Sequence, residues 1–364
     1  MPDGKNARPD WRGNLIEIEP YVPGEQFSSP GLIKLNTNEN PFPPSPGSIN
    51  ALRGLNGEDL RRYPDGDGGP LREALGRSLR IGGDNVFVAG GSDEVLAFAF
   101  KACFNGRLPI IFPDITYSFY PVWCRLFGIP YREVPLDGGF RIKAEDYGVA
   151  NGGIVLANPN APTGISEGLP FLEKILSMNE GSVVIVDEAY AAFGGESAIG
   201  LLSRFENLLV VNTFSKSRSL AGMRIGYAAG SRALIDSLRA VKDAFNSYPL
   251  SAAAQRAGVA CLEDEAYYRE KAMEICRLRD KYSARLKGLG FKLTDSSANF
   301  LFAAHPEIDA GRLYSWLKDR NILVRWWDKP RIRNHVRITV GREEDMDILI
   351  SNISEYIERD GRTD

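Results

Sequence analysis

Five short apolar runs most constrain what this chain can fold into. They occupy Val86–Ala89, Ile110–Phe112, Ile154–Ala157, Val183–Val186 and Leu208–Asn212. Runs this short, rich in Val and Ile and bounded by Gly, Pro, Asp or Asn, are typical of strands buried on both faces of a parallel sheet. A helical pattern from about Ser92 to Phe104 follows the first run. The alternation predicts an α/β fold whose mostly parallel sheet is sandwiched by helices.

The pattern of the sequence, and with it the expected secondary structure, changes at two places. The first ~35 residues are rich in proline and show little periodicity, which is typical of an extended arm. After about residue 250, helical patterns precede short strand candidates. These segments are Ala252–Cys261, Tyr267–Leu289, Asn299–Ala303, Ile322–Val324 and Val336–Val340. We therefore expect an N-terminal arm over residues 1–34, a large α/β domain over 35–250 and a smaller α+β domain over 251–364.

Composition argues against several classes of protein. The chain has 44 Lys and Arg against 47 Asp and Glu, a net charge of −3, so it offers no global basic field for nucleic acid or an anionic membrane. Its four cysteines and two histidines are too scattered for a disulfide framework or a metal centre. The start of the chain lacks an apolar signal core, and no apolar run approaches the ~18 residues of a transmembrane helix. We expect a cytoplasmic protein with no metal.

Polar residues follow four of the apolar runs, at the edge where open parallel sheets bind ligands. They are Gly90–Glu94, Asn158–Gly164, Asp187–Tyr190 and Thr213–Lys216. Gly91 and Ser92 open a predicted helix, and the free N–H groups of a helix start favour a phosphate. A plain tight turn before a helix is the alternative.

The segment around Lys216 gives a sharper prediction. The hydroxyls of Thr213 and Ser215 and the guanidinium of Arg224 can hold a dianionic phosphate. The Lys216 amine is then free to attack an aldehyde, unless it too binds the phosphate. Asp187 follows four aliphatic residues, where a carboxylate needs a cation such as a protonated pyridine nitrogen. A helix N-cap is the alternative role for Asp187.

Taken together, these residues resemble the pyridoxal-phosphate-dependent aminotransferases of fold type I, and most closely the histidinol-phosphate aminotransferase group. The motifs are RYPD (62–65), GGSDE (90–94), NPNAPTG (158–164), DEAY (187–190) and SKSRSLAGMRIGY (215–227). Further matches are PYVPG (20–24), LNTNENPF (35–42), PDITYSFY (113–120), SSANF (296–300) and VRITVG (336–341). The resemblance thus covers nearly the whole chain in order.

The resemblance implies pyridoxal 5'-phosphate as cofactor and assigns the residues around its ring. Lys216 matches the lysine that forms the Schiff base, and Asp187 matches the carboxylate paired with the pyridine nitrogen. Asn160 and Tyr190 match the residues that hydrogen-bond the phenolic oxygen. Lys216, Asp187 and Tyr190 are therefore the expected catalytic residues.

The ring and phosphate of the cofactor have further implied contacts. Tyr117 matches the aromatic residue that stacks on the ring, but a stretched turn before it leaves Tyr120 as an alternative. The implied phosphate ligands are Gly91, Ser92, Asp93, Thr213, Ser215 and Arg224. Tyr63 matches a tyrosine that reaches the phosphate of a neighbouring subunit, which implies a homodimer.

Four residues are implied in substrate binding: Tyr21, Asn160, Arg325 and Arg337. Arg337 matches the arginine that receives the acidic group, and Arg325 matches a second arginine that helps with a phosphate. Tyr21 matches a tyrosine that closes over the substrate. The adjacent tryptophans at 326–327 either narrow the pocket or pack the small domain. Ser217–Ser219 departs from the family pattern by adding the charge of Arg218 near the cofactor.

The activity implied is a ping-pong amino transfer from histidinol phosphate to 2-oxoglutarate, a small-molecule amine and a 2-oxo acid. An aromatic amino acid aminotransferase, or a decarboxylase resembling threonine-phosphate decarboxylase, shares most of the motifs. A non-catalytic ligand sensor, like the aminotransferase-like half of certain transcription regulators, is a third interpretation. The intact Lys216 and the lack of a helix-turn-helix extension before residue 30 argue against it.

Overall fold

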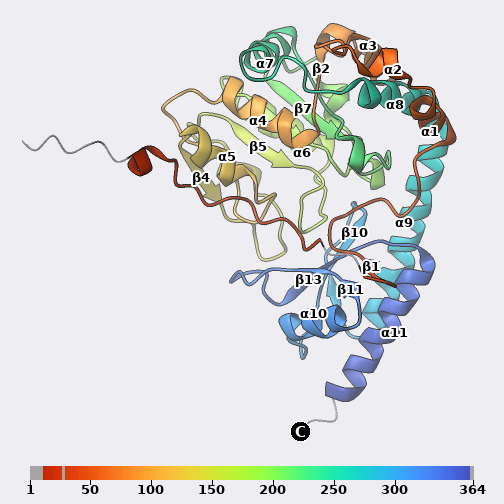
Figure 1. The fold of residues 1–364 in the computed structure, drawn as a ribbon. Helices are drawn as coiled ribbons and strands as arrows, with labels where there is room; N and C mark the ends of the chain where they lie inside the picture. The colour runs from red at the N-terminus through yellow and green to blue at the C-terminus, as the bar shows by residue number, and fades with distance from the viewer. Residues whose placement is uncertain (1–10, 27–28, 361–364) are drawn as a thin grey trace, which may run out of the picture.

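The computed structural model describes residues 11–26 and 29–360. An upper body holds a large sheet, a lower body holds a small one, and the long helix α9 (Glu265–Gly288) runs beside both (Figure 1). The described segments of the N-terminal arm, drawn in red to brown, run between the two bodies. The remaining positions of the predicted arm, residues 1–10 and 27–28, lie outside the described residues, as do residues 361–364.

Within the described residues, the larger sheet has seven strands in the order β2-β8-β7-β6-β5-β3-β4. Its strands are β2 (Val86–Ala89), β3 (Ile110–Pro113), β4 (Tyr131–Val134), β5 (Ile154–Ala157), β6 (Val184–Asp187), β7 (Leu208–Thr213) and β8 (Gly226–Gly230). Only β8 runs antiparallel to its neighbours β2 and β7. The five apolar runs all form strands, and the prediction of a mostly parallel sheet is confirmed. Strands β4 and β8 were not predicted from the sequence.

Helices cover both faces of this sheet, as predicted. The upper body contains α1 (Pro46–Arg53), α2 (Gly57–Leu60), α3 (Gly69–Leu79), α4 (Ser92–Cys103), α5 (Tyr120–Phe127), α6 (Leu169–Met178), α7 (Arg232–Phe245) and α8 (Ala252–Glu263). Leu209 and Val211 of β7 pack in the cluster formed with α4, α5 and α7. Leu208 and Val210 pack in the cluster formed with α6 on the other face. This alternation explains why the strand carries no polar residue until its end.

The smaller sheet has the order β12-β13-β10-β9, with every pair antiparallel. Its strands are β9 (Lys292–Leu293), β10 (Phe300–Ala304), β12 (Arg325–Trp326) and β13 (His335–Thr339). One face, with Leu301, Ala303, Val336 and Ile338, packs in one core with α9, α10 (Ala310–Asp319) and α11 (Glu343–Asp360). The arm joins this body where β1 (Ile33–Lys34) pairs in parallel with β11 (Ile322–Leu323).

The segment after residue 250 packs on the upper body before it reaches the lower one. Cys261 of α8 and Tyr268 of α9 share a core cluster with Leu71 and Val86. Ile275 and later residues of α9 belong to the core of the small body. The domain boundaries at 34/35 and 250/251 stay predictions.

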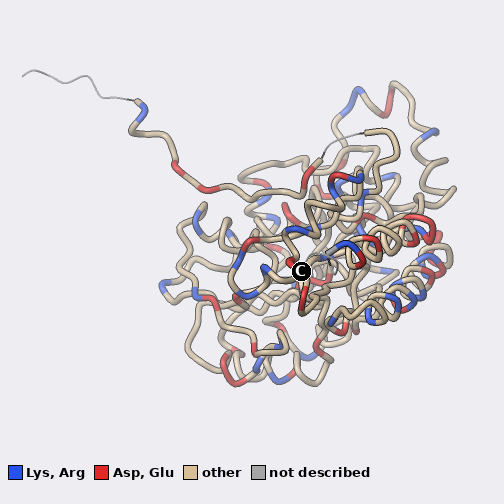
Figure 2. Tube along the Cα trace, turned by 90° about the horizontal axis from the view of Figure 1, so that it is seen from below, with Lys and Arg blue, Asp and Glu red and all other residues tan. Residues whose placement is uncertain are grey.

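Positive and negative side chains are interspersed along the chain, including both signs on its helices, without a large region of one sign (Figure 2). None of the helices within the described ranges is long and apolar enough to cross a membrane.

Candidate active site

The ends of four strands bring the predicted site residues to one edge of the large sheet. Asp187 ends β6 and Thr213 ends β7, the neighbouring strand. Because β8 is antiparallel to both β7 and β2, the end of β2 lies at this same edge, and Gly226 at the start of β8 pairs with both Ala89 and Thr213. The residues that follow β2, β5, β6 and β7 therefore converge, as the topology of such sheets requires.

Two glycines shape the start of α4 at this edge. Gly91, the N-cap, has φ of 89°, a region that favours glycine. A Cβ at Gly91 would collide with the guanidinium of Arg224, and a Cβ at Gly226 would collide with the backbone of Gly91 and Ser92. Only glycine therefore fits at these two positions, and the Arg224 guanidinium lies against the start of α4, where N–H groups favour an anion.

The predicted phosphate ligands form a connected cluster there. Arg224 pairs through Nη2 with Oδ2 of Asp93 at 3.2 Å and donates through Nη1 to Oγ of Ser215 at 3.4 Å. The Ser215 N–H donates to Oγ1 of Thr213 at 3.1 Å. The structure therefore brings together the hydroxyls, the guanidinium and the helix start that can bind a dianion.

The buried carboxylate of Asp187 has two donors within the protein. The Tyr120 hydroxyl donates to Oδ2 at 3.0 Å, and the Ala189 N–H donates to Oδ1 at 3.2 Å. Burial raises the pKa of Asp187 to about 6, while these two hydrogen bonds act in the opposite direction. This hydrogen bond of Tyr120 to Asp187 was not predicted from the sequence. The only feature that could have suggested it is the position of Tyr120, three residues after Tyr117.

The two candidate stacking tyrosines differ in exposure. Tyr120 is fully buried, and its hydroxyl is committed to Asp187. Tyr117 is only partly buried and donates its hydroxyl to Oδ1 of Asp93 at 2.8 Å. Its ring stands 5.7 Å from that of Tyr120 at an interplanar angle of 87°. Tyr117 is thus the less enclosed of the two tyrosines.

The amine of Lys216 lies in a largely enclosed place with one hydrogen-bond acceptor. Nζ donates to the Thr37 carbonyl at 3.0 Å and lies 5.8 Å from the ring centroid of Tyr190. Burial, aided by the charge of Arg337, lowers the pKa of Lys216 to about 8. A lysine in this state is readily deprotonated and can act as a nucleophile or proton carrier.

The segment 35–42 is hydrogen-bonded to several of the predicted site residues. Its sequence, LNTNENPF, matched a family motif, but no role was predicted for it. Asn38 donates through Nδ2 to the hydroxyl of Tyr190 at 2.9 Å, and its backbone carbonyl accepts from Asn299 at 3.1 Å. Asn40 donates through Nδ2 to the carbonyl of Lys216 at 2.9 Å. The run of amide side chains between apolar Leu35 and Phe42 was the available signal. Burial raises the pKa of Tyr190, so its hydroxyl stays protonated.

Asn160 is buried, and its amide is engaged within the protein. Nδ2 donates to the carbonyl of Ile115 at 2.9 Å and to Oγ1 of Thr163 at 3.0 Å. Oδ1 accepts from the hydroxyl of Thr116 at 2.8 Å. These bonds tie the loop after β5 to the segment that carries Tyr117. A contact of Asn160 with cofactor or substrate stays a prediction.

Two arginines face each other on the small sheet. Arg325 of β12 and Arg337 of β13 are direct cross-strand partners. Arg325 donates to the carbonyls of Val22 and Pro23 at 3.0 and 3.1 Å, and Arg337 donates through Nη2 to the carbonyl of Asn36 at 2.9 Å. Neither pairs with a carboxylate among the described residues, and the buried Nε of Arg337 has no partner. Like charges placed opposite each other destabilise a sheet, so an anion between these two side chains would stabilise the pair.

The N-terminal arm lies over the site. The ring of Tyr21 stacks on Phe119 with 4.5 Å between centroids and lies 6.1 Å from Tyr117. Glu25 pairs with Lys318 at 2.6 Å and fixes the arm to the small body. The structure therefore places Tyr21 between the large-sheet residues and the two arginines.

The adjacent tryptophans point in different directions. Trp327 lies 5.2 Å from the guanidinium carbon of both Arg325 and Arg337. Trp326 instead stacks with Tyr314, with centroids 6.0 Å apart, and packs against the small-domain core. Trp326 thus packs the small domain, one of the two alternatives from the sequence, and Trp327 lies beside the arginine pair; that it narrows the pocket stays a prediction.

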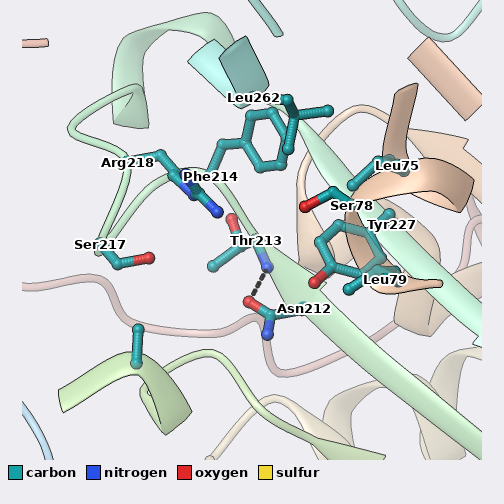
Figure 3. A pocket seen from close by; sticks show the side chains of 11 residues that line it. Leu75, Ser78, Leu79, Asn212, Thr213, Phe214, Ser217, Arg218, Tyr227 and Leu262 are labelled. Atoms are coloured by element: carbon teal, nitrogen blue, oxygen red, sulfur yellow. Dashed lines mark hydrogen bonds between the residues drawn. The ribbon is translucent and has the colours of Figure 1, made fainter. Parts of the chain in front are cut away.

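Arg218 lies on the far side of the loop that carries Lys216. It pairs with Glu265 at 2.6 Å and lies over the ring of Tyr268 at 5.3 Å. With Thr213, Asn212 and neighbouring residues it lines a cavity of about 90 Å³ (Figure 3). The charge that Ser217–Ser219 adds is therefore compensated by Glu265.

The structure does not bring Tyr63 to the other predicted residues of its own chain. Its side chain is 82% exposed and stacks on Tyr248 with 4.6 Å between centroids. Within residues 11–26 and 29–360, no group of three or more His, Cys, Asp or Glu side chains is arranged to hold a metal ion.

Comparisons with known proteins agree with this geometry. The family model of aminotransferase class I and II matches residues 30–353. The chain is 50% identical over 349 residues to a protein from Methylococcus capsulatus named histidinol-phosphate aminotransferase 1, covering 96% of this chain and 98% of that one. It is 45% identical over 347 residues to the histidinol-phosphate aminotransferase of Lactococcus lactis, covering 95% and 98%.

A solved structure shows the same fold. The histidinol-phosphate aminotransferase of Sinorhizobium meliloti, in complex with pyridoxal-5'-phosphate, matches with a TM-score of 0.81 and 24% identity, covering 90% of this chain and 91% of that one. The resemblance that the motifs indicate is therefore confirmed across the fold. This chain belongs to the aminotransferase class I and II family.

Proposed function

We propose that this protein is a pyridoxal-phosphate-dependent aminotransferase that transfers the amino group of histidinol phosphate to 2-oxoglutarate, a step of histidine biosynthesis in the cytoplasm. The observation that carries the substrate class is the facing pair Arg325 and Arg337, which has no carboxylate partner among the described residues. The names of the relatives at 45–50% identity support the choice of substrate.

The residues present fit the cofactor. Lys216 offers an amine with a lowered pKa, and the buried Asp187 lacks a cationic partner among the residues described. The start of α4 with Arg224 and Ser215 suits a phosphate. When bound, pyridoxal phosphate supplies an aldehyde that condenses with amines and a protonated ring that withdraws electrons from the reacting carbon.

The large-sheet residues then have defined tasks. Lys216 would hold the cofactor, and its amine, whose pKa is lowered to about 8, could take up and return a proton at the substrate carbon. Asp187 would pair with the ring nitrogen, and Tyr120 holds its carboxylate in place. Tyr117 would stack on the ring, because Tyr120 is enclosed by the core. Tyr190, held by Asn38, would hold a proton near the phenolic oxygen.

The small-domain residues bind the two substrates in turn. The planar guanidinium of Arg337 can bind the carboxylate of an oxo acid bidentately, and with Arg325 it can bind a phosphate. Tyr21 of the arm covers the bound substrate and excludes water. One site of this kind accepts an anionic amine and an anionic oxo acid alternately, which gives ping-pong kinetics.

Tyr63 supports a homodimer with shared sites. Its 82% exposed ring, fixed on Tyr248, is placed to contact another molecule rather than its own site. In the proposed dimer its hydroxyl reaches the cofactor phosphate of the neighbouring subunit.

A half-reaction screen tests the proposed function. The yellow, cofactor-loaded protein is mixed separately with histidinol phosphate, phenylalanine, tyrosine and threonine phosphate, and the visible absorbance is followed. Histidinol phosphate should bleach the band fastest. Bleaching by phenylalanine and tyrosine alone would instead support an aromatic amino acid aminotransferase. Loss of carbon dioxide from threonine phosphate would support the decarboxylase.

A further inference from the structure

We infer that Trp327 is a positioning residue for the anionic group of the substrates: its indole ring holds Arg325 and Arg337 together on one face of the small sheet while leaving both free of carboxylates. This inference rests on the proposed function, because it assigns the tryptophan to the anion site of that reaction.

The facing arginines pose a physical problem. Cross-strand partners in an antiparallel pair have Cβ atoms about 4.5–5.5 Å apart, and like charges at this separation repel each other. Arg337 is also buried, which lowers its pKa and adds to the cost of keeping it charged. When no anion is bound, the carbonyls of Val22, Pro23 and Asn36 accept hydrogen bonds from the pair, and the Phe300 ring lies 5.3 Å from the Arg337 guanidinium carbon. None of these groups contacts both arginines.

Elsewhere in this chain, arginines are held by carboxylates. Arg204 pairs with Glu173 at 2.6 Å, and Arg331 pairs with Asp114 at 2.6 Å. A carboxylate at the arginine pair would compete with the substrate for the same N–H groups. An aromatic face attracts a guanidinium without accepting its in-plane hydrogen bonds, so it occupies none of the donors that the backbone carbonyls leave available.

Trp327 has the geometry for this task. Its ring centroid lies 5.2 Å from the guanidinium carbons of both Arg325 and Arg337, within the ~6 Å range of cation–π attraction. The ring is itself fixed against the cluster that contains Ile115 and Phe302. Trp327 therefore links the large-domain loop to both arginines and sets the position of the anion site.

The neighbouring tryptophan supplies a matched control. Trp326 opposes Val336 and packs with the small-domain core, away from the arginines. Changes at 326 and 327 remove the same kind of side chain from consecutive positions. Only the change at 327 removes a ring that contacts the arginine pair.

The test measures anion binding directly, without turnover. Glutarate, a dicarboxylate that cannot react, and inorganic phosphate are titrated by calorimetry into the cofactor-loaded wild type, Trp327→Leu, Trp327→Phe and Trp326→Leu. We expect Trp327→Leu to weaken glutarate binding about tenfold and Trp327→Phe, which keeps an aromatic face, about threefold. Trp326→Leu should stay within about twofold of wild type.

Single-turnover kinetics add a second readout. The enzyme loaded with the aminated cofactor is mixed with 2-oxoglutarate, and the concentration dependence separates binding from the chemical step. Trp327→Leu should raise the half-saturating concentration about tenfold and leave the limiting rate nearly unchanged. Thermal melting of each variant shows whether the raised half-saturating concentration comes from a general loss of structure. The milder variant Trp327→Phe serves the same purpose.

Three results would overturn the inference. They are wild-type affinity in Trp327→Leu, equal weakening in Trp326→Leu, and a loss confined to the limiting rate. Failure of the proposed function looks different: histidinol phosphate would then leave the wild-type absorbance unchanged, while the glutarate affinities would still rank as above.

Discussion

The two halves of the site treat charge in opposite ways. On the large sheet, Asp93 pairs with Arg224, and Asp187 accepts from Tyr120 and the Ala189 N–H but has no cationic partner among the described residues. On the small sheet, Arg325 and Arg337 have backbone carbonyls and aromatic rings but no carboxylate among the described residues. The large-sheet half is thus compensated except at the position expected for the pyridine nitrogen, which suits a resident group that stays in place. The uncompensated small-sheet half suits anions that come and go.

This difference has a structural origin. The large-sheet residues follow buried strands and the start of α4, where each polar group must be hydrogen-bonded or lose stability. The arginines lie on strands of a four-stranded sheet whose other face packs in the small-domain core, while their own face also carries the buried Phe302 beside Arg337. The arm residues around Tyr21 close the gap between the halves.

Lys216→Ala should have the largest effect, and it tests the compensated half. The variant loses both the nucleophile and the proton carrier, so turnover should fall by about 10⁴-fold. Cofactor affinity should largely persist, because Asp187 and the phosphate ligands remain. Steady-state kinetics and cofactor titration check this. Full activity in the variant would remove Lys216 from the mechanism.

Arg337→Leu tests the uncompensated half. Removing one charge of the pair should raise the KM for both substrates by about 100-fold, with a smaller change in kcat. Arg333→Leu is the control, since Arg333 is exposed and paired with Asp328. Equal effects of the two changes on KM would show that the arginine pair is not the anion site.

Tyr120→Phe should shift the pH profile. Burial already raises the pKa of Asp187 to about 6, and the Tyr120 hydrogen bond holds it down. Without that bond the pKa rises further, so the carboxylate is protonated at a higher pH. The acidic limb of the pH dependence of cofactor binding, where Asp187 of the cofactor-free protein titrates, should move up by about one pH unit, with about a tenfold loss of affinity at pH 6.

Tyr147→Phe is the matched control for that variant. Tyr147 is also fully buried, and its hydroxyl has no hydrogen-bond partner within residues 11–26 and 29–360. Its removal should leave the pH profile in place. A pH profile of Tyr120→Phe that coincides with wild type would contradict the role assigned to Tyr120.

Tyr63→Phe should have the smallest effect. Loss of one hydrogen bond to a phosphate across the proposed dimer should weaken cofactor binding about threefold to tenfold. Equilibrium dialysis of the cofactor measures the change. Unchanged affinity would argue that Tyr63 only packs against Tyr248 or a partner surface.

Much of this arrangement can be predicted from the sequence. The apolar runs predicted five of the sheet strands, because Val and Ile in short buried segments allow few alternatives. The edge strand β4 was missed because Arg132 and Glu133 interrupt its apolar character, and β8 because Gly226–Gly230 carries little strand propensity. Packing, not local preference, makes these two segments strands.

The features of the site also fall into those that the sequence predicts and those that depend on packing in the folded chain. The motifs predicted which residues gather at the sheet edge, because chain order and topology fix that edge. The motifs did not predict that Tyr120 donates to Asp187, or that Trp327 contacts both arginines. The first contact joins residues that are 67 positions apart in the chain. The second depends on the pairing of β12 with β13, which places Arg325 opposite Arg337 only in the folded chain.

Covalent trapping of the cofactor tests the central assignment most directly. The purified protein is incubated with pyridoxal phosphate, reduced with borohydride, digested and analysed by mass spectrometry. The account predicts one modified site, Lys216, and a yellow colour before reduction that histidinol phosphate bleaches. A colourless protein, or a reduced adduct at any other lysine, would contradict it.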